Sequence, residues 1–175
     1  MLKPDISFVH KYFMAEKQAA MILLVIGSSA IILALISFFL IKTNATFFKG
    51  AAVPFAIIGL LMLLVGINIY NRSDKQRLDI SYKMGLEPFA FVKNEELPRM
   101  EKVAKSFKAI MYTEAALMVL GLALFFYFRT NTSQIFWKGF GISLALIALV
   151  ALVFDNDAEK RSKDYNVSLQ TLIGS

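Results

Sequence analysis

The chain of 175 residues contains no cysteine and only one histidine, His10. Disulfide bonds, thiolate metal sites and thiol catalysis are therefore excluded, because each of them needs a cysteine sulfur. A histidine-rich metal or haem site is disfavoured too, since His10 alone cannot supply such a ligand set. The sequence therefore predicts a protein without a cofactor.

Motifs that carry catalysis are also absent. The sequence has no glycine-rich phosphate loop, no pair of carboxylates at a useful spacing within an apolar stretch, and no nucleophile paired with a histidine other than His10. Charged residues make up only 18% of the chain. We therefore do not expect an enzyme.

What the chain has in abundance is apolar sequence. Hydrophobic residues form 57% of it, above the roughly 45–50% of a soluble domain. They gather in four stretches, and the run from Met21 to Ile41 has no charge on any face. About 20 apolar residues cross a bilayer core of about 30 Å as a helix. The sequence thus predicts an all-α membrane protein with transmembrane helices at residues 18–41, 51–70, 107–128 and 136–154.

The basic residues between these stretches are sorted to one side. Fifteen lysines and arginines lie before the first stretch, between residues 71 and 108, or after the fourth stretch, and only four lie in the two short connections. Cytoplasmic loops carry such an excess. We expect a multi-pass protein of the bacterial inner (cytoplasmic) membrane with both termini in the cytoplasm. The net charge of +6 then belongs to loops beside the membrane, and nucleic acid is not an expected partner.

The chain also resembles one unit used twice. Residues 38–50, FFLIKTNATFFKG, align with residues 125–139, FFYFRTNTSQIFWKG, if two residues are left unmatched. Each unit would be a helical hairpin, so the four spans would form two tandem hairpins related by a pseudo-two-fold axis along the membrane normal. The alternative is that two outer turns have independently reached a similar basic, polar and aromatic composition.

Residues 71–106 predict a cytoplasmic helical hairpin rather than a plain loop. The second helix should continue to Gly85, and a new helix should start near Asn94, with Pro98 in its first turn. One face of this extension is apolar and the rest is basic. That face would pack on the extension of the second helix, or would bind a partner or anionic lipid. Residues 156–175 are expected to form a cytoplasmic tail.

Glu114 is the one acidic residue well inside a predicted span. An acidic side chain there is costly, so it should face the other helices, and Asn68 on the second helix lies at a similar depth. We expect these two residues to form an intramembrane polar pair joined by a hydrogen bond. The pair would clamp two helices together, or Glu114 would carry a proton or cation. A third interpretation places Glu114 closer to the membrane surface.

The architecture resembles that of small four-span bacterial inner-membrane proteins, among them the immunity proteins of pore-forming toxins, and the segment EELPRMEKV (residues 95–103) is similar to uncharacterised bacterial membrane proteins. This resemblance implies a non-enzymatic protein that neutralises a membrane-targeting toxin. The alternative is a small ion or proton-coupled transporter or channel subunit that uses Glu114. Lipid, a membrane-inserted toxin or other membrane protein, and a second copy in a homodimer are the expected partners. Toxin contacts would come from the outer turns, namely Lys42, Asn44, Lys49, Arg129, Asn131, Trp137 and Lys138.

Overall fold

The computed structural model describes residues 6–174, and all the secondary structure in them is helical. The long helices are α1 (Ser7–Leu35), α2 (Ala45–Leu86), α4 (Leu97–Phe128) and α5 (Ile135–Gly174). Shorter pieces complete the chain: α3 (Pro88–Phe91), two π-helical turns (Ile36–Leu40 and Val92–Glu96) and a 3₁₀ turn (Thr132–Gln134). The all-α prediction is confirmed, and four helices are long and apolar enough to cross a membrane.

Three predicted spans lie within one continuous helical stretch each, the span 18–41 runs one residue past Leu40, where its stretch ends, and every stretch is longer than its span. The four stretches contain 34 to 43 residues, roughly twice what a bilayer core needs. Residues 156–174, expected as a tail, continue α5 as a helix. Asn94 does not cap α4, because it lies inside the second π-helical turn, and α4 begins at Leu97 with Pro98 in its first turn. α2 ends at Leu86, one residue past Gly85.

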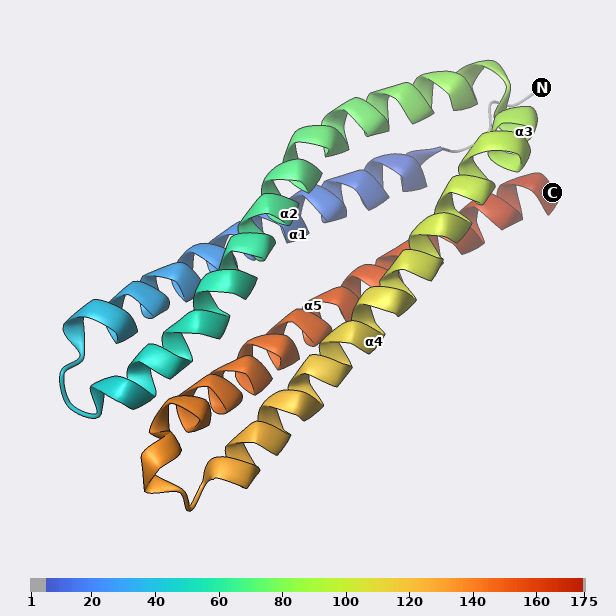
Figure 1. Ribbon diagram of the computed structural model, residues 1–175. Coiled ribbons are helices and arrows are strands. Elements are labelled where there is room, and N and C mark those ends of the chain that lie inside the picture. The colour runs from blue at the N-terminus through green and yellow to red at the C-terminus, as the bar shows by residue number, and fades with distance from the viewer. Residues whose placement is uncertain (1–5, 175) are drawn as a thin grey trace.

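Both described ends of the chain and α3 lie at one end of the molecule, which we call the terminal end (Figure 1). The opposite end, the turn end, holds the α1–α2 and α4–α5 connections. At the terminal end, ten buried side chains from α1, α2, α3, α4, α5 and the second π-helical turn form the larger apolar core. They are Val9, Tyr12, Phe13, Ile80, Met84, Phe91, Val92, Met100, Tyr165 and Leu169.

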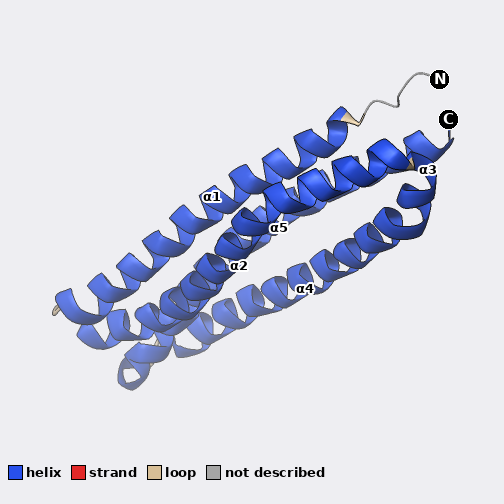
Figure 2. Cartoon of the chain, turned by 90° about the horizontal axis from the view of Figure 1, so that it is seen from above, coloured by secondary structure: helices blue, strands red, loops and turns tan. Residues whose placement is uncertain are grey.

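The helices associate unevenly. α1 packs along α2, α4 packs along α5, and α2 packs against α5. α4 barely touches α1 or α2, and both views show it running apart from them (Figures 1 and 2). In the most apolar part of this stretch only 6% of the residues are buried, against 28–39% in the other three. α4 therefore has one packed face, and the rest of its surface is open.

Glycines allow the closest helix contacts. Gly50 on α2 lies against the backbone of Phe136, and Gly139 on α5 lies against the backbone of Phe47. A Cβ at either glycine would overlap the facing carbonyl group. Small residues permit such approaches between apolar helices. These two contacts join α2 to α5 near the turn end.

Replacing Gly139 with alanine should therefore destabilise the fold. The added methyl group meets rigid backbone, and overpacking of this kind costs about 1–3 kcal/mol. Gly85→Ala is the matched control, because nothing lies within 4 Å of a Cβ there, and losing a helical glycine should stabilise by about 0.5–1 kcal/mol. Thermal unfolding of both purified variants measures the difference. An unchanged melting temperature for Gly139→Ala would contradict the tight α2–α5 crossing.

Candidate functional site: an open groove between α2 and α4

A groove of about 790 Å³ lies between α2 and α4 in the half of the molecule toward the terminal end. Side chains from α1, α2, α4 and α5 all line it. In Figure 1, α4 crosses in front of α5 in this half and runs apart from α2 until the two helices approach each other at α3. The groove exists because α4 packs on α5 alone and leaves its side toward α2 uncovered. Its volume lies within the range of about 300–1,000 Å³ that is typical of ligand sites.

The lining of the groove changes character along its length. Toward the turn end it is apolar, with Leu23, Leu61, Met62, Val65, Ile110 and Leu117. Toward the terminal end it carries charge, with Glu16, Arg72, Arg99, Lys102 and Arg161. Asn68, Glu114 and Asp155 lie in the lining too. A ligand that fills the whole groove must therefore be apolar at one end and polar or charged at the other.

The predicted pair of Glu114 and Asn68 is brought to the same groove, but no hydrogen bond joins the two in residues 6–174. Glu114 Oε2 is shielded from solvent and has no hydrogen-bond partner among those residues. The Glu114 carboxyl instead lies close to the Asp155 carboxyl of α5. The physical reason is that α4 packs on α5 and stays apart from α2.

Helix geometry explains the meeting of Glu114 and Asp155. Side chains lean toward the N-terminus of their own helix, and α4 and α5 run in opposite directions. Glu114 therefore leans toward the terminal end and Asp155 leans away from it. Two carboxyls so close can share a proton or hold a cation. No group of three or more histidine, cysteine, aspartate or glutamate side chains that could hold a metal ion occurs in the described part of the chain.

Two of the four cations in the groove are already paired within the protein. Arg161 Nε donates to Glu16 Oε1 at 3.2 Å. Burial raises the pKa of Glu16, and the nearby Arg161 and Arg72 guanidinium groups oppose that shift. Arg99 is paired with Glu96. Arg72 on α2 and Lys102 on α4 are exposed and form no ion pair within 4 Å in residues 6–174. These two cations are thus available on opposite walls of the groove.

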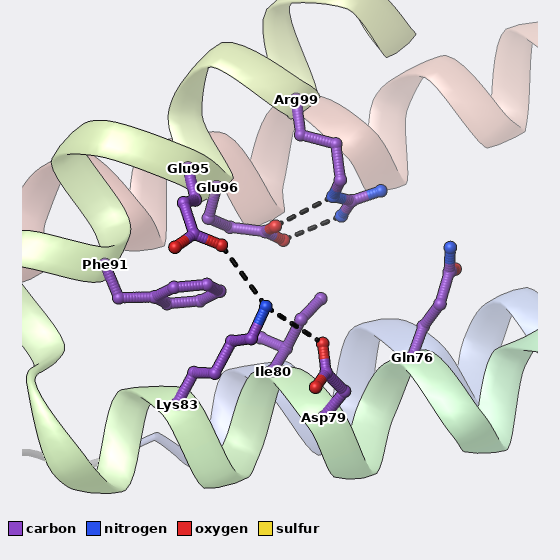
Figure 3. A pocket seen from close by; sticks show the side chains of 8 residues that line it. All are labelled: Gln76, Asp79, Ile80, Lys83, Phe91, Glu95, Glu96 and Arg99. Carbon is purple, nitrogen blue, oxygen red and sulfur yellow. Dashed lines mark hydrogen bonds and ion pairs between the residues drawn. The ribbon is translucent and has the colours of Figure 1, made fainter.

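The Glu96 carboxylate holds the charged end of the groove in place. Glu96 is only 1% exposed, and its two oxygens accept hydrogen bonds from Arg99 Nε and Nη2, both at 2.7 Å (Figure 3). Tyr165 of α5 donates a third hydrogen bond at 2.8 Å, and Tyr12 of α1 stacks on that ring with centroids 4.3 Å apart. Burial first, and then the Glu96 charge, raises the pKa of Tyr165. This network joins α1, α4 and α5.

Beside this network lies a smaller cavity of about 180 Å³ between α2 and the start of α4 (Figure 3). Lys83 pairs with Asp79 of its own helix at 3.4 Å and reaches across the cavity to Glu95 at 3.2 Å. Arg99 lines both the cavity and the groove. In the close-up, one of its nitrogens points away from Glu96. The one local signal for this cluster in the sequence is the spacing of three residues between Glu96 and Arg99, which suits an ion pair on a helical segment.

The predicted outer-turn residues lie at the turn end, away from the charged part of the groove (Figure 1). Asn44 adopts the left-handed conformation, with φ of 53°, and Asn131 Oδ1 accepts a hydrogen bond from the Ser133 N–H at 2.9 Å. Lys49 lies over the Phe38 ring at 5.7 Å. Trp137 packs on Phe128 and other rings nearby. Lys42, Arg129 and Lys138 complete this surface. Its contact with a toxin stays a prediction.

No protein-family model, curated protein or solved structure matches the chain. The chemistry of the groove and of the turn end therefore provides the grounds for a functional assignment.

Proposed function

We propose that the chain is a multi-pass protein of the bacterial cytoplasmic membrane, with both ends and the α2–α4 connection in the cytoplasm. The side chains along the middle of the helices support this, because many large apolar residues there face outward. Val25 is 66% exposed, and Val119 is 61% exposed. Such a surface is unfavourable in water and favourable against lipid. The excess of basic residues toward the terminal end supports the orientation.

Reporter fusions test this topology. Fusions at Met1, Phe89 and Ser175 should report the cytoplasm, and fusions at Asn44 and Asn131 should report the outside. The reason is that each apolar stretch crosses once and the basic segments stay inside. A periplasmic signal from the Phe89 fusion would contradict either the four crossings or their direction.

The protein acts, in this proposal, by binding a ligand within the membrane and catalyses no reaction. The observation that carries the proposal is the groove, which opens sideways between α2 and α4 where these helices would face lipid. A ligand from the membrane could enter it without passing through water. Most of the lining is apolar, which suits a ligand that already resides in the bilayer.

An internal duplication would account for the paired architecture. In the alignment of the two proposed units, Gly50 corresponds to Gly139 and Phe47 corresponds to Phe136. The two close contacts are therefore equivalent: the glycine of each unit lies against the backbone of the corresponding phenylalanine in the other unit. Ser73 and Ser162 also correspond, and they are 2% and 1% exposed. A pseudo-two-fold axis between α2 and α5 would produce such equivalences.

An immunity-type protein is the most concrete form of this binding function. The turn end supports it, because the two connections are short, lie at the same end of the molecule (Figure 1) and carry basic and aromatic residues. Aromatic and arginine side chains are common at the centres of protein interfaces. A toxin inserted in the same membrane would contact this surface and the adjoining helix faces, and would be held closed.

Protection of cells tests the immunity-type form. Expression should protect against one membrane-active toxin and not against unrelated ones. Scrambling residues 42–49 and 129–138, with Gly50 and Gly139 left unchanged to preserve the helix crossing, should reduce protection at equal expression. The double substitution Lys75→Gln with Lys105→Gln, at the other end, is the control and should protect fully. Full protection by the scrambled variant would remove the turns from the mechanism.

Proton-coupled or cation transport is the second candidate, and the close pair of Glu114 and Asp155 favours it. The pair lines the groove beside its apolar part, where two carboxyls could bind and release a proton or cation. The limited number of polar groups in the apolar part of the groove weighs against a continuous pathway.

Flux through liposomes tests the second candidate. If the pair carries the ion, Glu114→Gln and Asp155→Asn should each abolish pH-driven flux while the protein still folds, because titration is then essential. Glu87→Gln changes an exposed carboxyl outside the groove and should leave flux intact. Absence of flux in the wild-type protein would exclude transport and leave Glu114 as a structural residue.

A further inference from the structure

We propose that the groove binds an anionic phospholipid of the cytoplasmic leaflet, with its phosphate between Arg72 and Lys102 and an acyl chain along the apolar half. This inference rests on the proposed function, because it requires the helices to cross the membrane in the stated orientation. It adds the chemical class of the ligand and the residues that recognise it.

The first support is the depth of the two cations. Arg72 lies two residues beyond the span 51–70, and Lys102 lies five residues before the span 107–128. At 1.5 Å per residue these offsets are about 3 Å and about 7.5 Å along the helices, outside the hydrocarbon core. The polar headgroup region extends over that depth. A lipid phosphate would therefore meet both side chains without leaving its normal level in the bilayer.

The second support is the charge that remains after internal pairing. Arg161 and Arg99 have acidic partners inside the protein, at Glu16 and Glu96. Arg72 and Lys102 face the groove from opposite walls and form no ion pair within 4 Å in residues 6–174. The carboxylate near Arg72 is that of Glu16, which is already paired with Arg161. An arginine can bind phosphate with two parallel hydrogen bonds, and a lysine adds a compact positive charge. The site thus fits a phosphate group better than it fits a neutral or cationic headgroup.

The third support is the continuity of the groove from these cations into its apolar half. Val65 and Ile110 lie on opposite walls, and Leu61 and Leu117 extend the lining toward the turn end. An acyl chain attached to the phosphate would cover these side chains, whereas inorganic phosphate would leave them uncovered. A second copy of the chain fits less well, since a symmetric contact through this face would bring like charges together.

The experiment uses the full chain in nanodiscs of phosphatidylcholine with a minor fraction of phosphatidylglycerol. Native mass spectrometry after transfer to detergent counts the lipids that stay bound. The wild-type protein should retain one phosphatidylglycerol per chain. Arg72→Gln with Lys102→Gln should weaken this retention about tenfold or more, because two charge-assisted contacts are lost. Lys75→Gln with Lys105→Gln removes two exposed cations from the same helices outside the groove, and should retain lipid like the wild type.

A second pair of variants tests the acyl-chain part. Val65→Trp fills the groove without changing charge and should lower lipid retention, whereas Leu64→Trp places the same ring on an exposed neighbouring position outside the lining and should not. Equal retention of both lipids, displacement of phosphatidylglycerol by inorganic phosphate, or a dimer that seals the groove without lipid would each overturn the inference. Failure of the protein to insert in nanodiscs at all would instead contradict the proposed membrane function.

Discussion

The crossing of α2 over α5 is the contact on which the rest of the structure depends. Gly50 and Gly139 bring the two backbones together near the turn end, and no side chain separates them there. At the terminal end, the buried Glu96 network and the apolar core join the helices again. Between these two fixed ends, α4 has α5 as its only extensive neighbour. The groove is the space that results.

The long helices could be predicted from the sequence because a run of about 20 apolar residues has few other interpretations. Which helices touch could not be predicted, because a stretch such as Met21–Ile41 is apolar on all faces and its periodicity identifies no packing side. For that reason the similar depth of Glu114 and Asn68 did not identify a contact: both line the groove, but no hydrogen bond joins them in residues 6–174. Glu96 and Tyr165 are 69 residues apart, and no local pattern connects them.

The helical end of α5 was missed although the sequence contained a signal for it. Ala158, Ser162, Tyr165 and Leu169 are all buried, and their spacing of three or four residues is that of one helix face. The surrounding residues of 156–175 are largely polar, so this spacing does not stand out as an apolar stretch. Because α5 continues, Tyr165 can reach Glu96, and the charged end of the groove has a rigid wall.

The groove and the turn end give the two sides of the membrane different roles in the proposed account. Toward the cytoplasm, Arg72 and Lys102, which form no ion pair within 4 Å in the described part of the chain, lie beside an apolar channel and suit an amphiphile from the inner leaflet. Toward the outside, short turns fixed by the glycine contacts present a compact surface to another protein. Neither proposed role requires a catalysed reaction, a thiol or a metal ligand set, and the chain has no cysteine and one histidine.

The central claim is that α2 and α4 stand apart in a lipid bilayer, and the absence of cysteine makes this directly measurable. Spin labels attached to Leu64→Cys on α2 and Tyr112→Cys on α4 report the separation of the two walls by pulsed electron paramagnetic resonance. Both positions are exposed, at 57% and 76%, so the labels should not disturb packing. The account predicts a narrow distribution at the distance of the open groove. Directly packed helices have axes about 8–10 Å apart. A shorter label-to-label distance, of the size expected for such direct packing of α2 on α4, would contradict it.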